Sequence, residues 1–223
     1  MTRKERYFTP DTIDGRAAAF LRETNAVRRT GTTLFDPRRS ALLVLDLQKY
    51  FLDEDSHAFV PGGPAILPRV RDLAEAYAEM GLPLFFTRHG NDVRNAGRMA
   101  DWWGDMIGVN DPRGEIIEGI GAGKGTVIVK SQYDAFHETG LAEILRQRSV
   151  EQVVVCGVVA HLCCESTARS AFVRGFHVFF TVDATADYHE DFHRASLLNL
   201  AHGFAVPILA GDLLRAMKNA DAR

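Results

Sequence analysis

The sequence predicts an α/β fold: a three-layer α/β/α sandwich around a doubly wound, mostly parallel six-stranded sheet. Several short runs are apolar along their whole length, as is typical of strands that a parallel sheet buries on both faces. Segments with helical spacing alternate with these runs, which is the pattern of βαβ units. The 223 residues, 46% of them hydrophobic and 25% charged, suit one such domain with a large core.

Six apolar runs are expected to form the sheet. They span residues 41–45, 84–86, 126–129, 153–156, 178–182 and 205–208. Pro207 favours an edge position or a strand end for the last run, because proline cannot donate a ladder hydrogen bond. Helices are expected at 64–80, 139–148, 161–174 and 192–202, and Gly81 is a natural C-cap for the first of them.

Two regions depart from this alternation. Residues 1–38 are polar and arginine-rich, with one expected helix after Thr9-Pro10-Asp11, so we interpret them as an N-terminal arm. The arm is expected to pack on the domain, residues 39–223, or on a neighbouring subunit, with Arg28, Arg29, Arg38 and Arg39 in solvent. The connection 87–124 is too long to be a plain loop, so it is expected to be functional or to carry short elements.

Composition excludes several classes of function. The net charge of −3 and the absence of an obvious basic face give no reason to expect nucleic acid or a membrane as partner. No apolar run approaches the roughly 20 residues of a membrane span, and no apolar signal-peptide core follows the first ten residues. Three cysteines, Cys156, Cys163 and Cys164, make a poor disulfide framework and fit a reducing compartment. We therefore expect a soluble cytoplasmic protein.

Three reactive side chains follow predicted strands. Asp46 ends the first strand, Lys130 ends the third, and Cys163 lies on the helix after the fourth. Taken singly, each has a structural interpretation as a cap, an exposed charge or a small buried side chain. Because ligands of parallel sheets bind beyond the carboxyl ends of the strands, the three are expected to meet there. Together they supply the base, the cation and the nucleophile that covalent catalysis by cysteine requires.

The expected chemistry starts from the thiol of Cys163. We expect this residue in the first turn of its helix, where the helix dipole and the nearby Lys130 favour the thiolate. Asp46 would take the thiol proton and later deliver it to a leaving group. The tight turn 157–160 leaves backbone N–H groups near the sulfur, and those of Val159 and Cys163 are candidates to stabilise an oxyanion.

Three segments carry a resemblance to a known family. Leu42–Phe51, Lys130–Phe136 and Gly157–Ala168 resemble the signature segments of the isochorismatase-like cysteine hydrolases, and the likeness extends over about residues 38–215. The resemblance implies a catalytic triad of Asp46, Lys130 and Cys163, and a cis peptide bond between Val158 and Val159. Further side chains are candidates to line the substrate pocket: Gln48, Phe51, Arg88, Trp103, Tyr133 and His161.

The adjacent Cys163 and Cys164 require a choice of nucleophile. The family pattern places the nucleophile four residues before the threonine of a Thr-Ala pair, which here is Thr167-Ala168 and selects Cys163. Adjacent residues on a helix point about 100° apart, so only one of them can face the site. Cys164 and Cys156 are therefore expected in the core.

Two branches of the family compete for the substrate. One cleaves C–N bonds of amides and ureides, and the other, the isochorismatases, lacks the cysteine and hydrolyses a vinyl ether with the aspartate as general acid. Residues 48–52, 160–161 and 183–188, with the pair Trp102-Trp103, look like the isochorismatase branch. Cys163 favours acyl chemistry, because vinyl ether cleavage needs no thiol. A binding protein without activity and a thiol redox protein using Cys163 and Cys164 remain alternatives.

No metal or cofactor is expected. Zinc-binding nicotinamidases carry Asp-x-His after the second strand, where this chain reads Thr87–Asn91, and Asp55-Ser56-His57 is interpreted as a surface turn. Among the charged residues of the connection, His89, Arg94 and Arg98 are expected mostly in solvent, whereas Arg88 is a candidate to hold a substrate carboxylate. The expected partner is a small planar amide, with an anionic group as an open option.

Self-association is also expected. The resemblance implies oligomers, often dimers or tetramers. Small apolar side chains on the predicted helix 161–174, namely Ala168, Ala171 and Val173, offer a face on which copies of the chain could pack.

Overall fold

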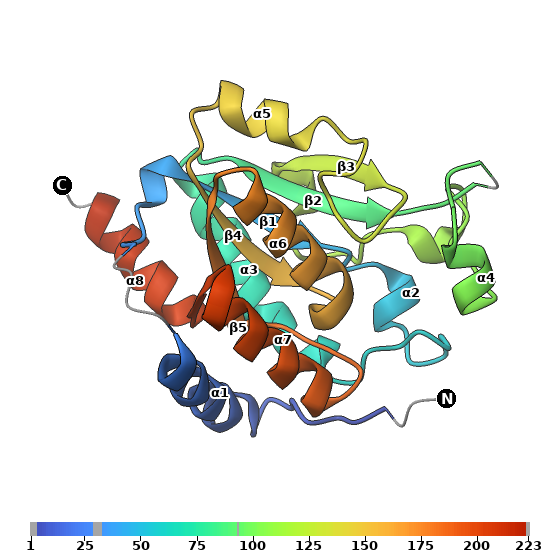
Figure 1. Ribbon diagram of the computed structural model, residues 1–223, viewed down its shortest axis with the longest axis horizontal. Coiled ribbons are helices and arrows are strands. Elements are labelled where there is room, and N and C mark those ends of the chain that lie inside the picture. The colour runs from blue at the N-terminus through green and yellow to red at the C-terminus, as the bar shows by residue number, and fades with distance from the viewer. Residues whose placement is uncertain (1–3, 29–32, 93, 222–223) are drawn as a thin grey trace.

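The computed structural model describes residues 4–28, 33–92 and 94–221, and it confirms the α/β fold (Figure 1). Six strands form one sheet in the order β3-β2-β1-β4-β5-β6, and every neighbouring pair is parallel. The strands are β1 (Ser40–Leu45), β2 (Leu84–His89), β3 (Thr126–Lys130), β4 (Gln152–Gly157), β5 (His177–Thr185) and β6 (Val206–Ile208). Because the strand order reverses between β1 and β4, the carboxyl ends there open toward a common crevice.

Helices cover both faces of the sheet. Helices α5, α6 and α7 lie on one face, whereas α3 and α8 lie together on the other (Figure 1). The helices are α1 (Ile13–Val27), α2 (Lys49–Leu52), α3 (Gly63–Glu79), α4 (Met99–Trp103), α5 (Leu141–Gln147), α6 (Glu165–Val173), α7 (Glu190–Gly203) and α8 (Ala210–Asp221). Of these, α2, α4 and α8 were not predicted. Among the described residues, no helix has the length and apolar character to cross a membrane.

The expectation that every strand is covered on both faces is wrong for β3. This strand is at one edge of the sheet, and Val127 and Val129 on it are 46% and 52% exposed.

The face expected to support self-association is largely buried. Ala168 and Ala171 are fully buried in the chain's own core, so of the three residues proposed for contact only Val173, 76% exposed, is accessible.

The long connection carries short elements of its own, as expected. Within residues 87–124 lie α4 and the two 3₁₀ turns Pro112–Gly114 and Ala122–Lys124. Gln48 ties this connection to the sheet, because its amide nitrogen donates to the carbonyls of His89 and Gly114, 2.9 and 2.8 Å away.

The N-terminal arm packs on its own chain. Tyr7, Phe8 and Phe20 are buried in the same apolar cluster as the central strands, and α1 lies beside α7 (Figure 1). The predicted helix begins at Ile13 rather than directly after Pro10, because residues 10–12 form a turn. Arg29, which was expected in solvent, lies outside the described residues.

A histidine buried under the arm makes the stability of the fold depend on pH. His193 of α7 is fully buried, packs edge-on against Phe8 and Phe20, and burial lowers its pKa from 6.5 to about 3. Below pH 6.5 His193 binds a proton in the unfolded chain but stays neutral in the folded protein. The unfolding free energy therefore falls as the pH drops toward 3. Between pH 6.5 and 4 we expect His193 to account for a loss of roughly 3 kcal/mol.

Thermal or urea unfolding between pH 7.5 and 4 measures this loss. His193→Gln removes the titrating group, so its unfolding free energy should change less over this range than that of the wild type. Parallel pH profiles for the two proteins would show that His193 does not titrate in this way.

Candidate active site

The side chains of Asp46, Lys130 and Cys163 meet at the carboxyl edge of the sheet. The Nζ of Lys130 lies 2.7 Å from Oδ2 of Asp46, as an ion pair, and donates to Sγ of Cys163 at 3.4 Å. The three residues are 0%, 2% and 4% exposed. Strand ends that are far apart in the sequence thus bring an acid, a base and a thiol into one enclosed cluster.

Asp46 is fixed by a threonine of the neighbouring strand β2. Its backbone has a φ of 50°, which is uncommon outside glycine. The N–H of Asp46 donates to the hydroxyl oxygen of Thr87 at 3.1 Å, and that hydroxyl donates to Oδ1 of Asp46 at 2.6 Å. The other carboxylate oxygen, Oδ2, forms the ion pair with Lys130.

Cys163 lies in a π-helical turn, Ala160–Cys164, and the α-helix α6 begins only at Glu165. Cys163 thus lies in the first turn of the helical segment, as expected, but this turn is π-helical rather than α-helical. The N–H of Cys164 donates to the carbonyl of Val159, which closes the wider turn at 3.2 Å. Such π turns occur frequently at functional sites.

Burial and the charges of the cluster shift the pKa values of its members in the enzyme without substrate. Burial and the Asp46 carboxylate raise the pKa of Cys163 to about 12, and Lys130 offsets them only in part. Burial alone would raise the pKa of Asp46, but the Lys130 ammonium outweighs it and holds that pKa below its ordinary value. The resting cluster is thus a carboxylate, an ammonium and a thiol. The helix dipole and Lys130 were expected to favour the anion, but burial and the Asp46 carboxylate outweigh them, and Asp46 is left to take the proton of the thiol, as expected.

The backbone before Cys163 leaves one N–H group open. The peptide bond between Val158 and Val159 is cis, where the resemblance placed it. The N–H of Val158 donates to the carbonyl of Leu45, and the N–H of Ala160 donates to the carbonyl of Ala186. In the described part of the chain, the N–H of Val159 has no such backbone partner. It therefore remains an open donor in the loop that leads to Cys163.

Several predicted pocket residues take part in aromatic contacts. The indole nitrogen of Trp103 donates to the hydroxyl of Tyr133 at 2.7 Å, and His161 stacks on Phe192 with ring centroids 4.6 Å apart. Burial raises the pKa of Tyr133, and a negative charge on Cys163 raises it further, so this phenol lies near the thiol. Trp103 is 46% exposed and its neighbour Trp102 is 79% exposed, so neither side chain belongs to the core.

Three predicted pocket residues take other positions. Gln48 is fully buried, and both ends of its amide bond to backbone, including the N–H of His89. Phe51 is buried edge-on against Tyr50. Successive side chains of a strand point to opposite faces, so Arg88 points away from the face on which Thr87 meets Asp46. Its guanidinium donates to the carbonyl of Val109.

His89 is a residue of this site that the sequence did not single out for the cluster. It is buried at the end of β2, and its Nε2 lies 2.7 Å from Oδ1 of Asn91. Burial and the charge of Lys130 lower its pKa to about 4, so it is neutral at pH 7. The period-two alternation of β2, with Thr87 and His89 on one face, was the available signal.

Asp187 is the second group that the sequence missed. It is fully buried two residues after β5, and its carboxylate accepts hydrogen bonds from the N–H and the Nδ1 of His161, 2.7 and 2.8 Å away. Its place just beyond a strand end, like that of Asp46, could have identified it.

Arg94 and Arg98 pair with nearby aspartates and are exposed, as expected for solvated loop charges. His57 of the surface turn bonds to the hydroxyl of Tyr50 and to Asp105. Within residues 4–28, 33–92 and 94–221, no group of three or more His, Cys, Asp or Glu side chains has the arrangement of a metal site.

Known proteins resemble this chain along most of its length. Nicotinamidase 3 of Arabidopsis thaliana is 37% identical over 201 residues, which are 87% of this chain and 98% of that protein. The isochorismatase of Bacillus subtilis (strain 168) is 30% identical over 84% of this chain. The chain spans only 61% of the length of that second relative.

Solved structures agree with the sequence relatives. A cysteine hydrolase from Pseudomonas syringae pv. phaseolicola 1448A superposes with a TM-score of 0.79 at 27% identity, covering 87% of this chain and 98% of that one. A pyrazinamidase of Pyrococcus horikoshii, solved in complex with zinc, gives 0.69 at 26% identity, covering 77% and 99%. A model of the isochorismatase domain matches residues 40–212. The chain therefore belongs to the isochorismatase family, and it is a hydrolase.

Proposed function

We propose that this hydrolase cleaves the C–N bond of a small amide or ureide through a thioacyl intermediate on Cys163. The observation that carries the proposal is the contact of Lys130 with both the Asp46 carboxylate and the Cys163 thiol inside a buried cluster. A nucleophile beside a base is the arrangement that acyl transfer requires. The 37% identity to a protein named nicotinamidase supports an amide substrate.

The proposed reaction uses the resting protonation state. Asp46 takes the thiol proton while Sγ of Cys163 attacks the carbonyl carbon of the substrate. The N–H groups of Val159 and Cys163 donate to the oxyanion that forms. The C–N bond then breaks, and the leaving nitrogen takes the proton from Asp46. Water, deprotonated by Asp46, hydrolyses the thioester and restores the thiol, while Lys130 stays protonated and balances the charge.

Hydrolysis of a vinyl ether is the competing chemistry. In that reaction Asp46 must carry a proton to act as general acid. The Lys130 ammonium lowers the pKa of Asp46, which disfavours the protonated form at neutral pH. The electrostatics of the cluster therefore support Asp46 as a base and favour the amide chemistry.

A panel of aryl and alkyl amides, ureides and isochorismate tests the proposal. We expect turnover of at least one amide or ureide, with an acyl adduct on the peptide that contains Cys163 after rapid acid quench and mass spectrometry. Turnover of isochorismate alone, with no adduct, would establish the vinyl ether chemistry instead. A protein that turns over no member of the panel, while Cys163 is reversibly oxidised, would indicate a redox role.

Arg88→Ala tests whether an arginine holds a substrate carboxylate. Because Arg88 points away from the face of β2 that meets Asp46, we expect KM for the best amide to stay within about twofold of the wild-type value. Steady-state kinetics measure it. A tenfold rise in KM confined to anionic amides would show that Arg88 does reach the substrate.

A further inference from the structure

We propose that Tyr7, in the N-terminal arm, is a positioning residue of the active site. It holds Asp187, and Asp187 in turn holds the loop that leads to Cys163. The inference rests on the proposed function only in that turnover requires an ordered oxyanion site. Tyr7 is 1% exposed, and its hydroxyl accepts a hydrogen bond from the N–H of Asp187 at 2.8 Å. The same hydroxyl lies 2.9 Å from Nδ1 of His193.

The donor and the acceptor of each hydrogen bond in this network follow from the bond that Thr185 makes, at the end away from Asp187. The hydroxyl of Thr185 donates to the carbonyl of Thr181 at 2.6 Å, so its oxygen must accept from Nε2–H of His193, 2.9 Å away. A neutral histidine with its proton on Nε2 has an acceptor at Nδ1. Tyr7 therefore donates its hydroxyl proton to His193, and its oxygen is free to accept from Asp187.

Asp187 passes this restraint to the active-site loop. Its Oδ2 accepts from the N–H of His161, and both carboxylate oxygens lie 2.8 Å from Nδ1 of the same residue. The N–H of Ala160 is bound at the same place, by the carbonyl of Ala186 at 2.9 Å. These bonds hold the two residues that follow Val159, and so they restrain the backbone that carries the open N–H of Val159. Loss of the Tyr7 hydroxyl would leave the N–H of Asp187 buried without its partner.

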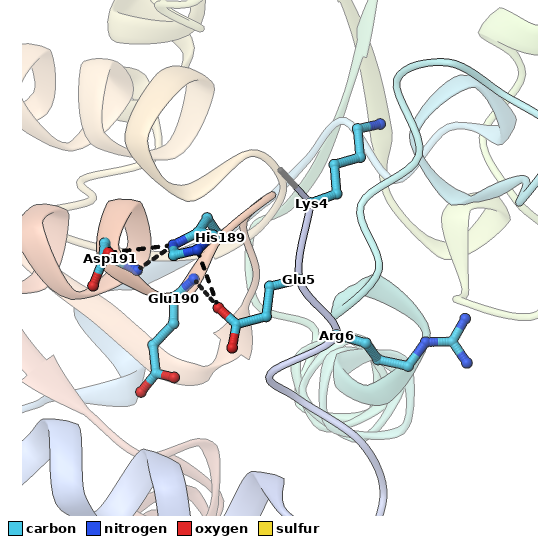
Figure 2. Close-up of a pocket in the computed structure, with 6 residues that line it drawn as sticks. All are labelled: Lys4, Glu5, Arg6, His189, Glu190 and Asp191. Carbon is cyan, nitrogen blue, oxygen red and sulfur yellow. Dashed lines mark hydrogen bonds and ion pairs between the residues drawn. The ribbon is translucent and has the colours of Figure 1, made fainter. Parts of the chain in front are cut away.

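The arm is anchored on both sides of Tyr7. Figure 2 shows Lys4, Glu5 and Arg6 passing the start of α7, where Glu5 faces His189. The N–H of Glu5 donates to the carbonyl of Tyr188 at 2.8 Å, directly beside Asp187. On the other side, Ile13 and Phe20 of α1 are buried in the core. Contacts on both flanks therefore fix the position of Tyr7.

Tyr7→Phe tests the proposal, with Tyr77→Phe as the matched control. Tyr77 is equally buried, and its hydroxyl bonds to Oγ of Ser40 at 2.7 Å, at the opposite end of β1 from Asp46. We expect Tyr7→Phe to lower kcat about tenfold with KM within twofold, because a displaced oxyanion donor affects the transition state more than binding. Tyr77→Phe should show a similar fall in melting temperature but keep the kcat of the wild type.

Two further readouts separate positioning from damage to the fold. The rate at which iodoacetamide alkylates Cys163 should be unchanged in Tyr7→Phe, because alkylation forms no oxyanion. In a cycle with Asp187→Asn, the effects of the two substitutions on kcat should fall short of additive, since Tyr7 acts through Asp187. All assays use an amide or ureide that the wild type hydrolyses, because vinyl ether hydrolysis forms no oxyanion. Failure of the proposed function is seen separately, as the absence of an acyl adduct on Cys163 in the wild type. An unchanged kcat, an equal loss in Tyr77→Phe, or additive effects would overturn the proposal.

Discussion

Cys163→Ala is expected to lower amide turnover by about 10⁴-fold or more, because removal of a covalent nucleophile leaves only binding and oxyanion stabilisation. No nearby thiol can replace it. Cys164 is fully buried, and burial together with the charge of Cys163 raises its pKa well above the ordinary value. Cys163 is buried, 4% exposed, but the substitution removes only one sulfur atom, so the protein should remain folded. Single-turnover and steady-state kinetics with the best amide measure the loss.

Cys164→Ala is the matched control for this experiment. It makes the same chemical change one residue away, in the core, and should keep kcat within about threefold at some cost in stability. If Cys164→Ala were as inactive as Cys163→Ala, the choice of nucleophile would be wrong. Full activity in Cys163→Ala would assign the reaction to Asp46 alone and promote the vinyl ether chemistry.

The sequence was sufficient to predict the cluster, because its three members each follow a strand. Parallel strands bring their carboxyl ends to one edge, so Asp46, Lys130 and Cys163 had to lie near that edge. The strand order was not predictable in the same way. Since β2 lies between β1 and β3, its side chain Thr87 reaches Asp46, and His89 lies where the charges of Lys130 and Asp46 affect its pKa. The local sequence of β2 contains no signal for which strands will flank it.

Arg88 illustrates how a shift of one residue changes an assignment. Both Arg88 and His89 follow the same apolar run, and the arginine looked like the better ligand for a carboxylate. Side chains of a strand alternate between the two faces, so only one of these neighbours can point to the site. The hydrogen bond between Thr87 and Asp46 identifies that face and assigns His89 to it.

Burial also decides the charge state of the thiol, which the sequence cannot supply. Proximity to Lys130 was predictable, and by itself it favours the thiolate. The degree of desolvation was not, because it depends on everything that packs over Cys163. The packing of the arm on its own domain was one of two expected outcomes, and the buried Tyr7, Phe8 and Phe20 are what anchor this otherwise polar segment.

Asp46→Asn should separate reactivity of the thiol from turnover. The Asp46 carboxylate raises the pKa of Cys163, whereas Lys130 lowers it. Asparagine removes the first effect and keeps the second, so the pKa of the thiol should fall and iodoacetamide should alkylate Cys163 faster at pH 7. Amide turnover should nevertheless fall by roughly 10³-fold, because no group remains to take the thiol proton and deliver it to the leaving nitrogen.

Asp46→Asn should also be less stable than the wild type, and a second buried aspartate provides a matched control. The substitution leaves the Lys130 ammonium buried without its carboxylate, which typically costs about 3–5 kcal/mol, less whatever a thiolate at Cys163 restores. Asp183→Asn serves as control, since Asp183 is also a buried aspartate, 7% exposed, paired with Arg69 at 3.2 Å. That variant should be destabilised but alkylated at the wild-type rate. Alkylation that is unchanged or slower in Asp46→Asn would mean that Asp46 does not hold Cys163 in its thiol form, and the role of Asp46 as the base would have to be abandoned.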